Sequence, residues 1–217
     1  MNFDYILFDL DGTLIDTSEG ITKSVQYALN KRGFVGHSLQ SLQSFIGPPL
    51  REQFMNFTGT GLDEGTQLVK TYREYYTETG IFECRPYDGI ENMLRRLVRK
   101  EKKLLVATSK PEVFARRILE HFSLDGYFTF IGGAKLDNTR TDKASVIRYV
   151  LDCVGGADAL SSRAVMVGDT HFDIEGAKQA GLCSIGVTYG FGDMERIRDA
   201  GPLCLCSSVR ELDKVLA

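Results

Sequence analysis

The chain has 217 residues, enough for one large domain or for one domain that carries an insertion. Its hydrophobic fraction of 43% and charged fraction of 25% are those of an ordinary globular protein. The net charge is −3 and no basic run occurs, so we expect no binding to nucleic-acid polymers or to anionic membrane. No apolar stretch approaches the roughly 20 residues that span a bilayer, and no signal-peptide pattern is visible. We therefore expect a cytoplasmic protein.

The first predicted element is a buried strand over Tyr5–Phe8. The next seventy residues read as helical instead, with apolar stripes that begin near Ile21, Leu39, Leu50 and Leu62. We predict that residues 16–85 form a small α-helical domain inserted after the first strand. The alternative is a long layer of helices that covers the same core, which requires unusual connections.

From Tyr87 onward, short apolar runs alternate with amphipathic segments. This alternation is typical of a parallel sheet covered by helices on both faces, so the predicted fold is α/β with a Rossmann-like core over residues 1–15 and 86–217. Asp88 and Glu91 are placed like a capping box, and Thr141 is expected to cap a later helix. The predicted strands are 104–107, 127–131, 164–167, 183–187 and 203–206, and the predicted helices lie near 88–100, 111–119, 141–151, 174–180 and 209–216.

The five cysteines are odd in number and form no Cys-x-x-Cys pair, so we expect them to be small buried hydrophobes in a reducing compartment. The three histidines show no ligand spacing with them, and zinc is not expected. His171 is expected to be an exposed residue in the first turn of a helix.

Polar side chains follow the predicted strands at the points where the strands end. In an open parallel sheet these carboxyl ends share one edge, where ligands bind. Oxygen ligands without soft donors suit Mg²⁺, which also neutralises phosphoryl oxygens. The candidate residues are Asp9, Asp11, Thr108, Ser109, Lys143, Asp169 and Asp173.

The metal ligands can be ranked by residue type. Asp9 and Asp169 are the best direct ligands, and the backbone carbonyl of Asp11 can add a third. Asp173 either binds the ion directly or holds a metal-bound water. The hydroxyls of the Thr108-Ser109 pair and the ammonium of Lys143 suit phosphoryl oxygens.

Four segments together resemble the motifs of the haloacid dehalogenase superfamily, in its phosphatase branch. They are Asp9-Leu10-Asp11-Gly12-Thr13, Thr108, Lys143 and the Gly-Asp-x-x-x-Asp pattern of residues 168–173. The resemblance implies that Asp9 attacks phosphorus and forms an aspartyl-phosphate. It implies that Asp11 protonates the leaving oxygen and then deprotonates the hydrolytic water. The helical insertion lies where such proteins carry a cap domain.

Two details of these motifs indicate which type of enzyme within the superfamily the chain resembles. Asp11 argues against the dehalogenases, which lack an acid two residues after the nucleophile. Gly168-Asp169 resembles phosphatases more than the Glu-Asp of the β-phosphoglucomutase type, which stays the alternative. An alternative of another class is a catalytically silent binding or regulatory protein on the same fold.

Within the insertion, Gly47, Pro48 and Arg51 belong to a stiff turn that is either a simple connection between helices or a loop that contacts substrate. With neighbouring segments it resembles phosphoglycolate phosphatase-like and 5′-nucleotidase-like hydrolases. We expect a small phosphorylated metabolite as the partner. The residues leave its identity and the oligomeric state open.

Overall fold

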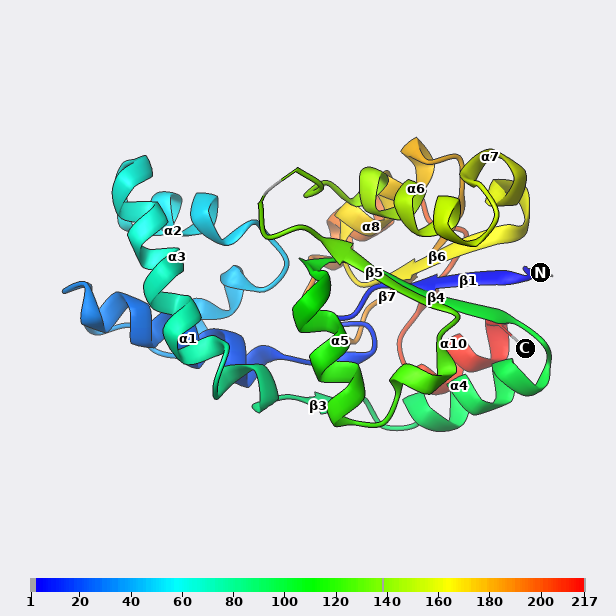
Figure 1. Ribbon diagram of the computed structural model, residues 1–217, viewed down its shortest axis with the longest axis horizontal. Helices are drawn as coiled ribbons and strands as arrows, with labels where there is room; N and C mark the ends of the chain where they lie inside the picture. Colours follow the sequence, from blue (N-terminus) through cyan, green and yellow to red (C-terminus); the bar gives the residue numbers. More distant parts are fainter. Residues whose placement is uncertain (1–2, 138, 217) are drawn as a thin grey trace. The chain divides into compact units, whose positions relative to one another are not determined.

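The computed structural model describes residues 3–137 and 139–216 and contains a six-stranded sheet in the order β5-β4-β1-β6-β7-β8 (Figure 1). Every neighbouring pair of these strands is parallel, which confirms the predicted fold class. The strands are β1 (Tyr5–Phe8), β4 (Lys103–Pro111), β5 (Phe130–Ala134), β6 (Ala164–Gly168), β7 (Cys183–Val187) and β8 (Leu205–Cys206).

Helices cover both faces of this sheet. Leu7, Leu105 and Met166 point to one face, where they share a fully buried cluster with side chains of α6 (Lys143–Val154). The short α7 (Ala157–Leu160) and α8 (His171–Gln179) lie on this same side, whereas the opposite side carries α4 (Ile90–Arg99), α5 (Glu112–His121) and α10 (Val209–Leu216) (Figure 1). Successive residues of each strand thus point to opposite faces of the sheet, and both faces are buried under helices. For this reason the strand sequences are apolar throughout.

The chain divides into two compact units, one formed by Met1–Ile15 and Pro86–Ala217 and the other by Asp16–Arg85. Two short strands, β2 (Ile15–Asp16) and β3 (Arg85–Pro86), pair with one another where the chain passes between the units. The second unit is helical and consists of α1 (Ser18–Lys31), the 3₁₀ turn η1 (Gln40–Phe45), α2 (Leu50–Thr58), α3 (Leu62–Tyr76) and the 3₁₀ turn η2 (Gly80–Phe82).

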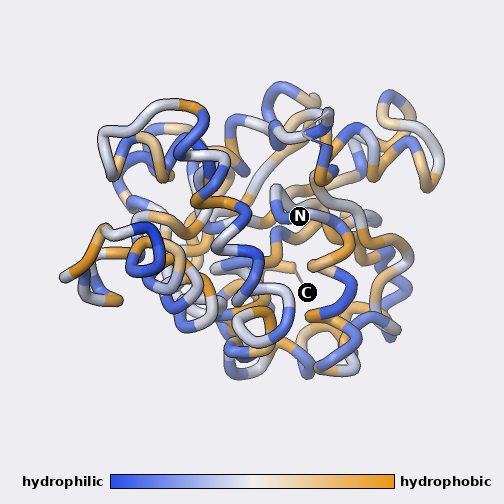
Figure 2. The backbone as a smooth tube through the Cα atoms, turned by 60° about the vertical axis from the view of Figure 1, so that its left-hand side comes forward, coloured by the Kyte–Doolittle hydropathy of each residue, from blue (hydrophilic) through white to orange (hydrophobic). Residues whose placement is uncertain are grey.

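Aromatic rings fill the inside of the helical unit. The ring centroids of Phe45 and Phe54 lie 4.9 Å apart, and those of Tyr72 and Tyr76 lie 5.1 Å apart in a stacked arrangement. Figure 2 shows hydrophobic and hydrophilic stretches alternating along the helices, as expected when only one stripe of each helix is buried. Tyr72 and Tyr76 of α3 are therefore part of the packing inside this unit.

Several predicted elements have other bounds or are of another type. The strand predicted at 127–131 begins only at Phe130, because Asp125–Tyr127 form a 3₁₀ turn before it. The stripe that begins near Leu39 forms a 3₁₀ turn over Gln40–Phe45 and no α-helix. Gly47 with φ of +102° and two prolines follow it, and these residues end the turn before a longer helix can form.

Both predicted helix caps are wrong. The cap residue of α4 is Gly89, with φ of +90° and no side-chain cap bond, so Asp88 and Glu91 form no capping box. The cap of α6 is Asp142 and not Thr141: its carboxylate accepts the Ser145 N–H at 2.9 Å. The short helix α9 (Met194–Asp199) was not predicted, because six residues are too few for a recognisable stripe.

The prediction that the cysteines are buried holds only for Cys206. Cys153 and Cys183 are exposed, Cys84 and Cys204 are half-buried, and all five are free thiols. Cys183 is the first residue of β7 and Cys153 lies in the last turn of α6, and such terminal positions reach solvent.

No helix within residues 3–137 and 139–216 is long and apolar enough to cross a membrane.

Candidate active site

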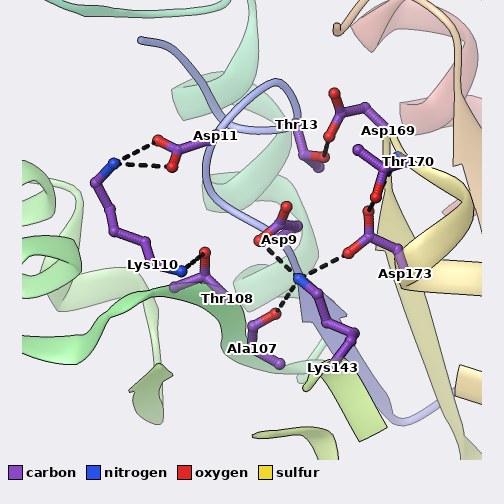
Figure 3. Close-up of polar contacts among 10 residues, drawn as sticks. All are labelled: Asp9, Asp11, Thr13, Ala107, Thr108, Lys110, Lys143, Asp169, Thr170 and Asp173. Atoms are coloured by element: carbon purple, nitrogen blue, oxygen red, sulfur yellow. Dashed lines mark hydrogen bonds and ion pairs between the residues drawn. The ribbon is translucent and has the colours of Figure 1, made fainter. Parts of the chain in front are cut away.

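Most of the predicted polar residues of the sheet unit lie at the carboxyl ends of β1, β4 and β6, and the other two, Lys143 and Asp173, lie at the starts of α6 and α8 (Figure 3). Directly after β1, residues 9–14 make a tight loop in which Gly12 has φ of +79°. A Cβ atom on Gly12 would lie 2.1 Å from Oδ2 of Asp169, so only glycine fits both the backbone and the space. The loop after β1 therefore packs against the acid that follows β6.

Three carboxylates form a buried cluster at this edge. Asp9, Asp169 and Asp173 each offer an oxygen atom, and these oxygens all lie within 4.8 Å of one another. The residues are only 7%, 1% and 0% exposed. A group of three acids at this spacing can hold a metal ion, and carboxylate oxygens are the donors that Mg²⁺ prefers.

Lys143, the first residue of α6, reaches into the cluster. Its Nζ lies 2.9 Å from Oδ1 of Asp9 and 2.7 Å from Oδ1 of Asp173, and it donates to the Ala107 carbonyl at 3.1 Å. Burial works against the charge of this ammonium, but the two carboxylates outweigh it and raise the pKa of Lys143. The lysine is therefore a permanently charged bridge between the two acids.

One ammonium does not balance three carboxylates. Burial, with the nearby charges of Asp173 and Asp9, raises the pKa of Asp169 well above its usual range. Burial also raises the pKa of Asp173, against the opposing effect of Lys143. The donor set and its excess negative charge fit a divalent cation, which offsets such repulsion.

Asp173 also organises the start of α8. Its Oδ2 accepts the Thr170 N–H at 3.0 Å and the Thr170 hydroxyl at 2.8 Å, while its Oδ1 faces Lys143. Thr170 is the cap residue of the helix, so this acid serves as the third residue of a capping box. The two carboxylate oxygens of Asp173 are thus engaged with the protein itself.

Asp11 lies apart from the three-acid cluster and pairs with a lysine that the sequence did not single out. Nζ of Lys110 lies 2.9 Å and 2.8 Å from the two carboxylate oxygens of Asp11. The prediction placed the end of β4 at Ala107, but the strand continues to Pro111 with a shift in register after Thr108. This continuation carries Lys110 to the edge, and a run of Ser-Lys-Pro alone gives no sign of it.

The predicted phosphate-binding residues lie beside these groups. Thr108 is buried, and its Oγ1 accepts the Lys110 N–H at 3.2 Å, whereas Ser109 is half-buried. Thr13 donates its hydroxyl to Oδ1 of Asp169 at 3.3 Å, a contact that the sequence did not indicate. All of these side chains belong to the sheet unit.

His171 lies in the first turn of α8 as predicted, but the prediction that it is exposed is wrong, because its side chain is buried with 8% exposure. Its ring centroid lies 4.0 Å from that of Phe172, and burial, with the charge of Arg196, lowers the pKa of His171.

Gly47, Pro48 and Arg51 belong to the helical unit, where Arg51 is exposed in the first turn of α2. Their contact with substrate stays a prediction.

We predict that Lys143→Met destabilises the metal-free protein strongly, because it leaves Asp9 and Asp173 buried without their counter-charge. The free energy of unfolding should fall by about 3–5 kcal/mol. Urea denaturation in EDTA measures it, with Lys178→Met as the control, since Lys178 is exposed on α8. A loss of the same small size in both variants would contradict the assigned role of Lys143.

Comparison with known proteins agrees with this geometry. The family model described as haloacid dehalogenase-like hydrolase matches residues 6–187. A 5′-nucleotidase of Pseudomonas aeruginosa is 44% identical over 216 residues, which cover 100% of this chain and 96% of the relative. A phosphoglycolate phosphatase of Aquifex aeolicus is 30% identical, with 86% of this chain and 85% of the relative covered.

A solved structure supports the same conclusion. The crystal structure of a predicted phosphatase from Clostridium acetobutylicum matches with a TM-score of 0.93 and 45% identity, and the match covers 100% of this chain and 99% of that one. The family model spans most of the sequence, from the first strand of the sheet to the end of β7. The chain therefore belongs to the haloacid dehalogenase-like hydrolases, in their phosphatase branch.

Proposed function

We propose that this protein is a Mg²⁺-dependent phosphatase that hydrolyses a small phosphate monoester through an aspartyl-phosphate on Asp9. The observation that carries the proposal is the buried cluster of Asp9, Asp169 and Asp173 with a single ammonium between two of them. Such a cluster is costly to fold unless it serves a cation and an anion that bind together. A phosphate ester with Mg²⁺ is that combination.

In this proposal Asp9 and Asp169 would hold the metal through their side chains and Asp11 through its backbone carbonyl. Asp173, whose own oxygens contact Thr170 and Lys143, would hold a water ligand of the metal. When bound, Mg²⁺ supplies positive charge that neutralises the phosphoryl oxygens. The rest of the chemistry belongs to the side chains.

In the first step the Asp9 carboxylate forms a bond to phosphorus and the bond from phosphorus to the ester oxygen breaks. Asp11 gives its proton to that leaving oxygen. In the second step Asp11 removes a proton from water, the water oxygen bonds to phosphorus, and the bond to Asp9 breaks, which releases inorganic phosphate. Lys143 holds the Asp9 carboxylate in place, and Thr108, Ser109 and Lys143 bind the phosphoryl oxygens.

Lys110 joins this set as a residue that fixes the orientation of Asp11. Its Nζ contacts both oxygens of that carboxylate, and the pair is largely buried, with side-chain exposures of 5% and 15%. Because the carboxyl group of Asp11 is held in one orientation toward the reacting oxygen, it is well placed to transfer a proton to that oxygen. Lys110 therefore couples the strand that carries Thr108 to the acid–base group.

The position before Asp169 favours hydrolysis over phosphomutase chemistry. A Cβ atom on Gly168 would lie 2.2 Å from Cγ of Asp173, so the glutamate of the mutase pattern does not fit here without displacing Asp173. The presence of every group that the chemistry needs also speaks against a silent binding protein.

The substrate class that we propose is a 5′-nucleoside monophosphate. The supporting observation is the relative named 5′-nucleotidase, which matches this chain over its full length at higher identity than the phosphoglycolate phosphatase does. The helical unit would serve as the cap that selects the leaving group, with Gly47, Pro48 and Arg51 in its substrate-contacting loop. A cap that closes during turnover excludes water from the phosphoryl site.

We predict that Asp9→Asn abolishes phosphate release, because an amide does not attack phosphorus, while the protein stays folded. The wild-type enzyme should lose activity in EDTA and recover it with Mg²⁺. Release of phosphate from an aryl phosphate measures both, with circular dichroism as the check on folding. Full turnover by folded Asp9→Asn, or undiminished activity in excess EDTA, contradicts the mechanism.

We predict that Asp169→Asn stabilises the metal-free protein at neutral pH. Since the folded protein raises the pKa of Asp169 through burial and the charges of Asp173 and Asp9, the metal-free wild type loses stability as pH rises from the usual carboxyl range through the raised value. Asparagine does not titrate, so the Tm advantage of the variant in EDTA should be large at pH 7.5 and vanish near pH 4.

Mg²⁺ should raise the Tm of the wild type at pH 7.5 but leave Asp169→Asn nearly unchanged. Asp199→Asn, at an exposed position, is the control. If the variant is less stable than the wild type in EDTA at pH 7.5, the cluster does not carry excess negative charge.

We predict that kcat/KM is highest for 5′-nucleoside monophosphates and at least about tenfold lower for phosphoglycolate, a difference of about 1.4 kcal/mol in transition-state binding. A panel of phosphate monoesters measured at saturating Mg²⁺ tests this. A higher kcat/KM for phosphoglycolate would reject the substrate class and leave the phosphatase chemistry intact.

A further inference from the structure

A loop after β7 closes around Asp169, and the catalytic chemistry above does not use it. β6 and β7 are parallel neighbours with Gly168 opposite Gly186, so residues 188–192 leave the sheet at the same edge as Asp169. Their sequence is Thr-Tyr-Gly-Phe-Gly. None of these residues belongs to the motifs by which the family was recognised.

The two glycines of this loop lie directly against Asp169. A Cβ atom on Gly190 would lie 2.4 Å from both Cβ and Oδ2 of Asp169 and 2.4 Å from the carbonyl oxygen of Gly12. A Cβ atom on Gly192 would lie 1.9 Å from the backbone oxygen of Asp169. Gly12, Gly190 and Gly192 thus all lie against Asp169, at distances that leave no space for a side chain at any of these three positions.

Hydrogen bonds fix the carboxylate further. The Phe191 N–H donates to Oδ2 of Asp169 at 2.8 Å, and the Thr13 hydroxyl donates to Oδ1 at 3.3 Å. A carboxylate has about four acceptor directions, so these two donors leave room for a cation on the same group. Each oxygen of Asp169 is thus oriented by one of these two donors.

Tyr189 connects the loop after β7 to the loop after β1. Its hydroxyl donates to the backbone carbonyl of Thr13 at 2.9 Å, and its ring packs edge-on against Tyr87 with centroids 4.9 Å apart. Thr13 lies in the loop that also carries Asp9 and Asp11. A displacement of Tyr189 would therefore move the loop of the nucleophile and the hydroxyl donor to Asp169 together.

We propose that Thr188–Gly192 is a positioning element that holds Asp169 in the rotamer that binds the metal, with Tyr189 as the residue that couples it to the nucleophile loop. The inference rests on the proposed function, because it concerns the metal site of that reaction. Groups that orient a metal ligand commonly change metal affinity by about 10- to 100-fold when they are altered.

Isothermal titration calorimetry with Mg²⁺ alone tests this in the metal-free protein. Gly190→Ala pushes a methyl group against Asp169 and should raise the Kd for Mg²⁺ by about 10- to 100-fold. Tyr189→Phe removes only the hydroxyl and should raise it by about tenfold. Gly126→Ala is the matched control, because a Cβ atom there meets nothing within 4 Å, and its Kd should equal that of the wild type.

Kinetics separate positioning from a merely structural role. At saturating Mg²⁺, Tyr189→Phe should keep the KM of the wild type for the phosphate ester while its apparent activation constant for Mg²⁺ rises. If Gly190→Ala or Tyr189→Phe lowers the Tm but keeps the wild-type Kd for Mg²⁺, the proposal is overturned. If Gly190→Ala does not fold, the Kd of Tyr189→Phe decides alone, and an unchanged value overturns the proposal. Failure of the wild type to bind Mg²⁺ would instead reject the proposed function.

Discussion

The burial of three carboxylates beside one lysine at the carboxyl edge of a parallel sheet is the constraint on which the rest of this structure depends. Asp9, Asp169 and Asp173 are almost fully buried, and Lys143 pairs with only two of them. Isolated buried charges cost several kcal/mol each, so the fold surrounds these groups with hydrogen-bond donors and with turns that have glycine at the points of closest contact. The excess of acidic groups over the single lysine lowers stability, but it also creates affinity for a cation and for a phosphoryl group bound together with that cation.

The sheet gives this cluster its geometry. β1 and β6 are direct neighbours, so the acids that follow them meet without any long-range adjustment of the backbone. Lys143 enters from the start of α6 and Asp173 from the first turn of α8, where it also caps the helix. The three acids and the lysine of the cluster therefore stand beside the ends of strands and helices. A site built in this way is oriented before substrate binds.

The sequence predicted the sheet and most of the site because both depend on local patterns. Apolar runs marked the strands, and the acids after Phe8 and Gly168 stood where parallel strands must end together. Lys110, Thr13 and Tyr189 could not be found in this way, since their partners lie 99, 156 and 176 residues away in the chain. His171 was misplaced because a helix pattern alone does not show that this first-turn side chain, whose ring lies 4.0 Å from that of Phe172, is buried. The helix caps at Gly89 and Asp142 depended on backbone angles that residue types only weakly indicate.

The most direct measurement of the central claim is the anomalous diffraction of Mn²⁺, used in place of Mg²⁺, in crystals of the protein. The account predicts one strong peak in direct contact with side-chain oxygens of Asp9 and Asp169 and with the backbone carbonyl of Asp11, while Lys143 keeps its contact with Asp9. A peak bound elsewhere, or an acid cluster without bound metal at millimolar Mn²⁺, would contradict it.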